Sequence, residues 1–121
     1  MLYSVDDRTP RRDAHRSDFQ IWRSRISDVE YQAMVDAINA FCDRGESFNA
    51  SWLPGKDPAI RAAFPPLTAA CGGSEEQSGF FFGNIVWRVI YDRTDEWYFL
   101  PADKEGEGPL GMQYWLRQEA D

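Results

Sequence analysis

Residues 79–91, GFFFGNIVWRVIY, form the longest apolar stretch of the 121-residue chain. In an extended chain successive side chains point to opposite faces, and aromatic or aliphatic side chains of this stretch fall on both. A strand that is apolar on both faces is typical of the buried centre of a sheet. The stretch therefore predicts a central strand that needs a covering layer on each side, with a bulge at Gly83.

Two segments further along the chain also have strand character. Residues 96–100 read EWYFL and end before Pro101, and residues 110–118 read LGMQYWLRQ. Short aromatic-rich runs separated by turn residues indicate hairpins. Together with residues 79–91, these segments predict an antiparallel meander over residues 79–118.

The residues upstream of the meander predict a long helix. Ser27 and Glu30 have the spacing of a capping box, in which each side chain satisfies the backbone N–H of the other residue. Gly45 supplies a left-handed stop. Between these signals, apolar residues recur at helical spacing and predict an amphipathic helix over residues 28–44. These residues are Tyr31, Met34, Val35, Ile38, Phe41 and Cys42.

Shorter elements surround this helix. Asp57 next to a proline is typical of a helix start, which predicts a short helix over residues 58–63, and another follows over residues 66–70. Residues 1–5 suit a short edge strand. Residues 18–25 fit either an extended segment or a short turn of helix.

Helices that precede strands joined by hairpin-length connections indicate an α+β fold. We expect one long amphipathic helix and several short helices packed on a three- to four-stranded antiparallel sheet. Residues 18–121 would form this single domain, and residues 1–17 would form a polar, arginine-rich arm or tail.

The net charge of −7 is unevenly distributed along the chain. Residues 1–30 contain six arginines and six acidic residues, which sum to zero, whereas residues 31–121 contain seven basic and fourteen acidic residues and carry the whole −7. An acidic body repels nucleic acid and attracts basic partners. The six arginines between Arg8 and Arg25 leave a nucleic-acid-binding arm as an alternative.

No sequence motif indicates a catalytic centre, a metal or a cofactor. Two cysteines, Cys42 and Cys71, and the single His15 are too few for a zinc site, and no phosphate-binding glycine loop is present. The chain has neither an apolar run of about 18 residues that would span a membrane nor an apolar secretory leader. We therefore expect a cytoplasmic, non-enzymatic protein with reduced thiols and no metal or cofactor.

Arg88 is the main candidate for a small-molecule site. It lies within the apolar stretch, and a buried guanidinium must pair with a carboxylate or bind an anion. We expect Arg88, Tyr91 and Trp97 to line a pocket between the helices and the sheet.

The aromatic residues also predict an interface. Aromatic residues make up 15% of the chain, more than one long helix would cover on a two-faced sheet. Tryptophan and tyrosine concentrate at the energetically dominant positions of protein interfaces. We expect a protein partner, or a second copy in a homodimer, to contact Trp22, Trp52, Tyr114 and Trp115.

These observations favour a small binding protein that holds a partner through an aromatic face rimmed by acidic residues. Two alternatives remain: a small-ligand-binding protein or minor enzyme with the pocket described above, and the nucleic-acid-binding arm. In its short length, acidity and aromatic content the chain resembles accessory proteins such as products of mobile gene cassettes and immunity proteins, which implies a binding role.

Overall fold

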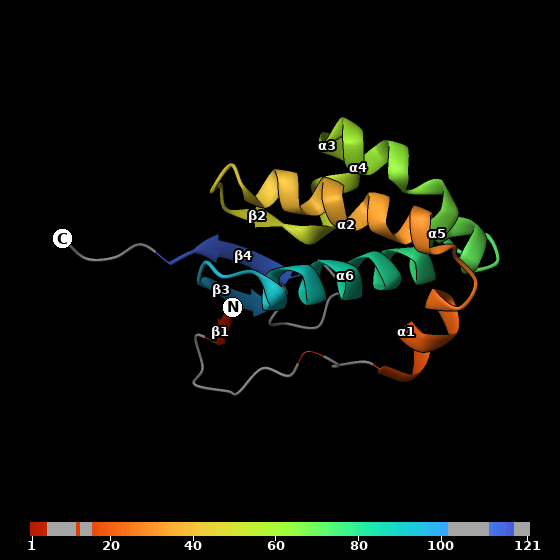
Figure 1. Cartoon of the computed structure of the whole chain (residues 1–121), viewed down its shortest axis with the longest axis horizontal. Helices are drawn as coiled ribbons and strands as arrows, with labels where there is room; N and C mark the ends of the chain where they lie inside the picture. The colour runs from red at the N-terminus through yellow and green to blue at the C-terminus, as the bar shows by residue number, and fades with distance from the viewer. Residues whose placement is uncertain (5–11, 13–15, 102–111, 118–121) are drawn as a thin grey trace.

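The computed structural model describes residues 1–4, 12, 16–101 and 112–117. Helices lie beside a four-stranded sheet, which confirms the α+β class (Figure 1). In chain order the elements are β1 (Leu2–Ser4), α1 (Arg16–Arg23), α2 (Asp28–Cys42), β2 (Phe48–Asn49), the 3-10 turn η1 (Ala50–Trp52), α3 (Leu53–Lys56), α4 (Pro58–Ala63), α5 (Pro65–Ala70), α6 (Glu75–Asp92), β3 (Trp97–Pro101) and β4 (Met112–Leu116).

Helix α2 confirms the predicted long helix. The Ser27 hydroxyl accepts a hydrogen bond from the Glu30 N–H at 3.1 Å, and the Glu30 carboxylate accepts one from the Ser27 N–H at 3.1 Å. Both halves of the capping box are therefore present. Regular helix ends at Cys42, two residues before the expected boundary, and Gly45 follows with a φ of 71°.

The predicted strand over residues 79–91 is wrong, because these residues belong to the 18-residue helix α6. The Ser74 hydroxyl caps this helix by accepting a hydrogen bond from the Gln77 N–H at 3.1 Å. The negative charges of Glu75 and Glu76 in the first turn interact favourably with the positive end of the helix dipole and stabilise the helix. The helix therefore begins at Glu75, and Gly83 lies in its interior rather than at a strand bulge.

The side chains of α6 are buried on a broad face. Buried positions recur every three or four residues, as on a helix that is covered by several neighbours. A helix buried on most of its circumference needs apolar residues at nearly every position, so its sequence also satisfies the pattern of a two-faced strand. The buried residues are Ser78, Phe81, Phe82, Ile85, Val86, Arg88, Val89 and Ile90.

The sheet has the order β1-β3-β4-β2. Strands β3 and β4 form the expected antiparallel pair, with Trp97 opposite Leu116. β1 confirms the predicted edge strand but runs parallel to β3, with Leu2 opposite Trp97, while β2 runs antiparallel to β4. The sheet is therefore mixed, and the expected three-stranded meander is wrong because its first member is a helix.

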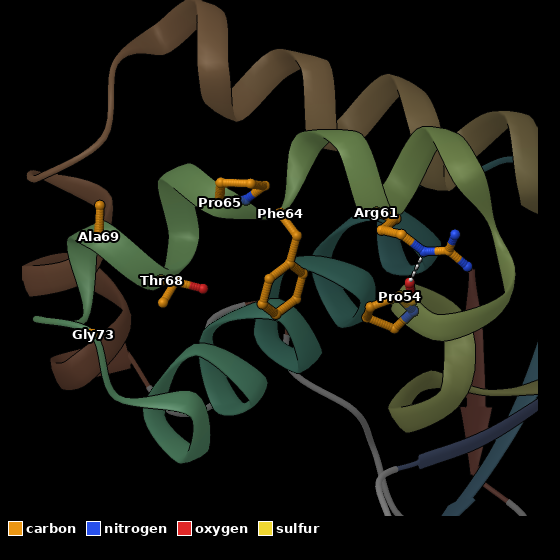
Figure 2. Close-up of a pocket in the computed structure, with 7 residues that line it drawn as sticks. All are labelled: Pro54, Arg61, Phe64, Pro65, Thr68, Ala69 and Gly73. Carbon is orange, nitrogen blue, oxygen red and sulfur yellow. Dashed lines mark hydrogen bonds between the residues drawn. The ribbon is translucent and has the colours of Figure 1, made fainter.

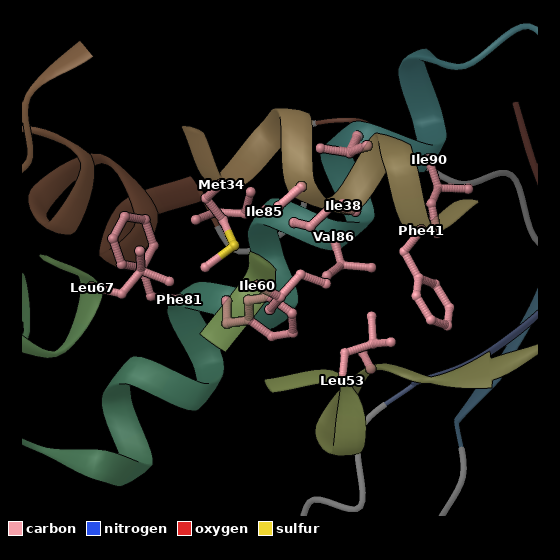
Figure 3. Packing of buried hydrophobic residues seen from close by; sticks show 14 of the residues in the cluster. Met34, Ile38, Phe41, Leu53, Ile60, Leu67, Phe81, Ile85, Val86 and Ile90 are labelled. Atoms are coloured by element: carbon pink, nitrogen blue, oxygen red, sulfur yellow. The ribbon is translucent and has the colours of Figure 1, made fainter. Parts of the chain in front are cut away.

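The core lies between the two long helices and extends onto one face of the sheet. Figure 3 shows Met34 and Ile38 of α2 close to Ile85 and Val86 of α6. All four residues are fully buried. The short helices and their connections close this core with Leu53, Ile60 and Leu67.

Aromatic rings join the helices to the inner face of the sheet. The ring centroids of Phe41 in α2 and Phe48 in β2 lie 5.4 Å apart, and those of Phe48 and Trp97 lie 5.8 Å apart. Trp87 of α6 meets Phe99 of β3 at 4.7 Å. The inner face of the sheet is thus filled by side chains from both long helices.

The remaining helices are short. For residues 18–25 the helical alternative is observed, since Phe19 and Trp22 of α1 pack against Phe81 of α6 with ring centroids 5.7 and 5.6 Å apart. Helix α4 has the predicted bounds, and α5 begins at Pro65, one residue before its predicted start.

The expected arm over residues 1–17 falls largely outside the described residues. Its first residues belong to the sheet as β1, and helix α1 begins at Arg16. His15 and most other positions of this segment lie outside the described residues, so the arginine-rich arm stays a prediction. Within the residues that the structure describes, no helix is both long enough and apolar enough to cross a membrane.

Candidate functional site

Arg88 and Trp97, two of the three residues expected to line a pocket, contact different parts of the molecule. Arg88 is 8% exposed and lies on α6 with its guanidinium carbon 3.9 Å from the centroid of the Phe19 ring. Trp97 is fully buried on β3 beside Phe48. Tyr91 is half-buried at the end of α6 and packs against the core. The space between helices and sheet where we expected the pocket is occupied by core side chains.

The described arginines of the N-terminal region make contacts within the molecule. Arg12 forms two hydrogen bonds of 2.8 and 2.9 Å to the Asp92 carboxylate, through Nε and Nη2. Arg23 pairs with Asp28 at 2.6 Å, and Arg25 donates to a backbone carbonyl at the end of α5 at 3.1 Å. The other three arginines of the segment lie outside the described side chains.

The four residues expected at an interface separate into two classes. Trp22 and Tyr114 are 7% and 1% exposed and belong to the core, and burial raises the pKa of Tyr114. Both side chains therefore lie inside the chain rather than on its surface. Trp52 and Trp115 are half-buried and accessible in part. Trp52 lies under the Lys56 ammonium, whose nitrogen is 4.5 Å from the ring centroid.

The outer face of the sheet carries an aromatic row, which we define as Tyr3, Tyr98 and Trp115. Tyr3 of β1 lies opposite Tyr98 of β3, and Tyr98 lies opposite Trp115 of β4. Ring centroids are 6.2 Å apart in the first pair and 5.9 Å apart in the second. Because directly opposed residues share a face of a sheet, the row crosses three strands on the face opposite Trp97.

Polar groups hold one end of the aromatic row. The Tyr3 hydroxyl donates a hydrogen bond to the Glu96 carboxylate at 3.1 Å, which raises the pKa of Tyr3. Arg117 pairs with the same carboxylate at 3.0 Å and places its guanidinium carbon 5.5 Å from the centroid of the Tyr3 ring. The row therefore has a carboxylate and a guanidinium at its border.

Arg93, the residue that follows α6, joins three elements. Its guanidinium donates to the Asn39 carbonyl at 3.2 Å, to Asp43 at 2.8 Å and to Asp95 at 2.9 Å. The Arg93 guanidinium lowers the pKa of Asp95. The contacts link the ends of α2 and α6 to Asp95, two residues before β3, so this cluster has a structural role.

A shallow open groove with a volume of about 570 Å³ crosses the surface of α4 and α5. Figure 2 shows Arg61 and Pro54 on one side of Phe64, and Ala69 and Gly73 on the other. Arg61 donates to the carbonyls of Pro54 at 3.3 Å and Gly55 at 2.5 Å. No feature of the sequence led us to expect this groove, because its residues come together only when α3, α4 and α5 fold against one another.

Neither cysteine forms a disulfide, and both are buried. Burial raises the pKa of the Cys42 thiol to about 12, which keeps this thiol protonated and unreactive at neutral pH. Among the described residues, no group of three histidine, cysteine, aspartate or glutamate side chains is arranged to hold a metal ion.

We compared the chain with protein-family models, curated proteins and solved structures, and none of these comparisons produced a match.

Proposed function

We propose that this chain is a non-enzymatic binding protein of the cytoplasm that holds a basic protein partner on the outer face of its sheet. The supporting observation is the aromatic row of Tyr3, Tyr98 and Trp115, which crosses three hydrogen-bonded strands on the face opposite the core.

The aromatic row has the composition of a protein-binding surface. Tyrosine, tryptophan and arginine are the residues whose truncation costs most at interfaces, and Arg117 borders the row. The rings are half-buried and contact one another. Side chains that are already held in place lose little conformational entropy when a partner binds.

The charge of the chain supports a basic partner. A net charge of −7 attracts a positively charged protein and accelerates the encounter. Association should therefore slow as the salt concentration rises, because salt screens interactions beyond about 10 Å at 0.1 M.

A photo-crosslinking experiment tests the proposal. We would replace Tyr98 with p-benzoylphenylalanine, irradiate living cells and identify the captured protein by mass spectrometry. The expected result is capture of one basic protein. The matched control carries the same group at Phe80, which is 42% exposed on α6, and should not capture that protein.

The purified partner then allows a quantitative test. Trp115→Ala should weaken binding at least about tenfold, as is typical of an interface hot spot, whereas Trp52→Ala should leave the affinity within about twofold. Equal effects of both variants would refute the proposal. Crosslinking of the chain only to itself, with a light-scattering mass of twice 14.0 kDa, would instead establish a homodimer.

A further inference from the structure

We propose that the aromatic row binds a proline-rich, basic segment of the partner in the polyproline II conformation, laid across the strands along Tyr3, Tyr98 and Trp115. This inference rests on the proposed function and adds to it the chemistry of the segment that the row recognises.

The row runs across the sheet rather than along its edge. Tyr3, Tyr98 and Trp115 are directly opposed on β1, β3 and β4, and directly opposed residues line up from strand to strand. A peptide that adds a strand instead runs along the sheet edge and is held by main-chain hydrogen bonds. A ligand that contacts all three rings crosses the strands, so side chains rather than main-chain pairing recognise it.

The rings of the row are tilted against one another. The planes of Tyr3 and Tyr98 meet at 58°, and those of Tyr98 and Trp115 meet at 32°. A flat ligand covers several rings at once only if their planes coincide, whereas tilted neighbours leave two wedge-shaped clefts. A ridged ligand fits such clefts, and aromatic-lined surfaces recognise polyproline II segments in this way.

The spacing of the rings matches this conformation. Neighbouring ring centroids are 6.2 and 5.9 Å apart. A polyproline II helix rises about 3.1 Å per residue, so residues i and i+2 are about 6.2 Å apart along its axis. Because this helix has three residues per turn, residues i and i+2 lie on adjacent ridges and contact one surface together.

Side chains on this face can donate hydrogen bonds to a ligand. Gln113 lies two positions before Trp115 on the same face of β4, directly opposite Asn49 of β2. The Asn49 side-chain oxygen accepts from the Ser51 N–H at 2.9 Å and the Ser51 hydroxyl at 2.7 Å, so its amide nitrogen is the group to offer a ligand. The Trp115 indole N–H also only donates. Proline lacks an N–H, and the carbonyls of polyproline II form no internal hydrogen bonds, so such a segment supplies the matching acceptors.

The charge of the chain favours basic residues between the prolines. A net charge of −7 attracts a basic segment and repels an acidic one or a second copy of the chain. Proline also holds the segment extended before it binds, and the rings already contact one another. Binding therefore orders few groups on either side.

Three synthetic peptides test the inference. We would titrate the chain with four repeats of Pro-Pro-Lys, of Ala-Ala-Lys and of Pro-Pro-Glu. The first should bind saturably, with NMR shifts concentrated at the Trp115 indole N–H and the amides of β3 and β4, and the other two should bind at least about tenfold more weakly. Equal affinity for Ala-Ala-Lys, shifts centred elsewhere, or no binding of Pro-Pro-Lys would overturn the inference.

Variants locate the binding on the row. Tyr98→Ala and Trp115→Ala should each weaken binding of the Pro-Pro-Lys peptide at least about tenfold, whereas Trp52→Ala, outside the row, should keep the affinity within about twofold. Circular dichroism verifies that each variant folds. Unchanged affinity in either row variant, or an equal loss in Trp52→Ala, would overturn the inference.

The two proposals fail in distinguishable ways. If the crosslinker at Tyr98 captures a basic protein through a segment without proline, the proposed function stands and this inference fails. If no basic protein is captured while the Pro-Pro-Lys peptide binds at the row, the proposed function fails and the recognition of proline by the row is established.

Discussion

The two long helices lie side by side but occupy different environments. Helix α2 buries five of its fifteen residues and exposes a polar face that includes Gln32 and Asp36. Helix α6 buries eight of its eighteen residues and meets α1, α2 and β3 through Phe81, Ile85 and Trp87. One helix covers the core from one side, and the other forms its centre. The stability of this fold should therefore depend more strongly on α6.

The largest expected effect separates two neighbouring phenylalanines of α6. Phe81→Ala removes a fully buried ring that contacts Phe19 and Trp22 and should lower the free energy of unfolding by about 3–5 kcal/mol. Phe80→Ala, at a 42% exposed position, should cost less than about 1 kcal/mol. Urea denaturation measures both. Similar losses would indicate that residues 79–91 are a strand covered on both faces.

The second comparison is between the stability lost when the N-terminal cap of α2 is removed and that lost when the cap of α6 is removed. Ser27→Ala removes the hydroxyl that accepts from the Glu30 N–H and donates to the Glu30 carboxylate, and it should cost about 1–2 kcal/mol. Ser74→Ala removes the single cap of α6 and should cost about 0.5–1 kcal/mol. Denaturant midpoints report the difference, and the reverse order would show that burial of α6 amplifies the effect of its cap.

Glycine replacements probe α6 and the turn that precedes it. At Gly83 an added Cβ meets no atom within 4 Å, so Gly83→Ala should stabilise the protein by about 0.5–1 kcal/mol through its higher helix propensity. Gly73 has a φ of 84°, and Gly73→Ala should destabilise by about 1 kcal/mol or more. Thermal unfolding of both variants provides the measurement. Destabilisation by Gly83→Ala would contradict the open surface at that position.

The smallest expected effect concerns the acid sensitivity of the link between α2 and α6. The hydrogen bond from Arg93 lowers the pKa of Asp95 from its ordinary value of 3.8. A carboxylate whose folded pKa is lowered stabilises the fold above its unfolded pKa and loses that contribution as the pH falls through the folded pKa. Because Asp95 is 34% exposed, the contribution should stay below about 1 kcal/mol.

A pH series of denaturation curves checks this expectation. As the pH falls below 3.8, the ordinary pKa of Asp95, the wild-type chain should lose stability more steeply than Arg93→Gln, which lacks the charge that lowers the pKa. Arg44→Gln, which removes an exposed pair with Glu46, serves as the control. Parallel curves for the wild type and Arg93→Gln would contradict the assignment.

Local signals made part of this fold predictable. The capping box of α2, the start of α4 at Pro58 and the antiparallel pairing of β3 with β4 all depend on residues close together in the chain. The identity of α6 depends on how many neighbours cover it, which no local pattern records. Its length of 18 residues and the cap at Ser74 were the usable signals, since a strand rarely exceeds 10 residues.

The candidate sites were predictable only in part. Trp115 was expected at a surface, and Tyr98 lies beside it through the antiparallel β3–β4 pairing. Tyr3 joins them through a parallel pairing with Tyr98, a residue more than 90 positions away. Trp22 and Tyr114 have the same chemistry as Trp115, and only the packing of α1 and the register of β4 determine their burial. The groove beside Arg61 depends on the angles between three short helices, which composition and spacing do not specify.

The cluster around Arg93 has a consequence for how the molecule opens. One guanidinium connects the last turn of α2, the end of α6 and Asp95, two residues before the β3–β4 hairpin. Backbone amides at these three places should therefore exchange with solvent deuterium as one cooperative unit. If so, the hairpin detaches from the helices only in excursions that also fray both helix ends, and Arg93→Gln would separate these events.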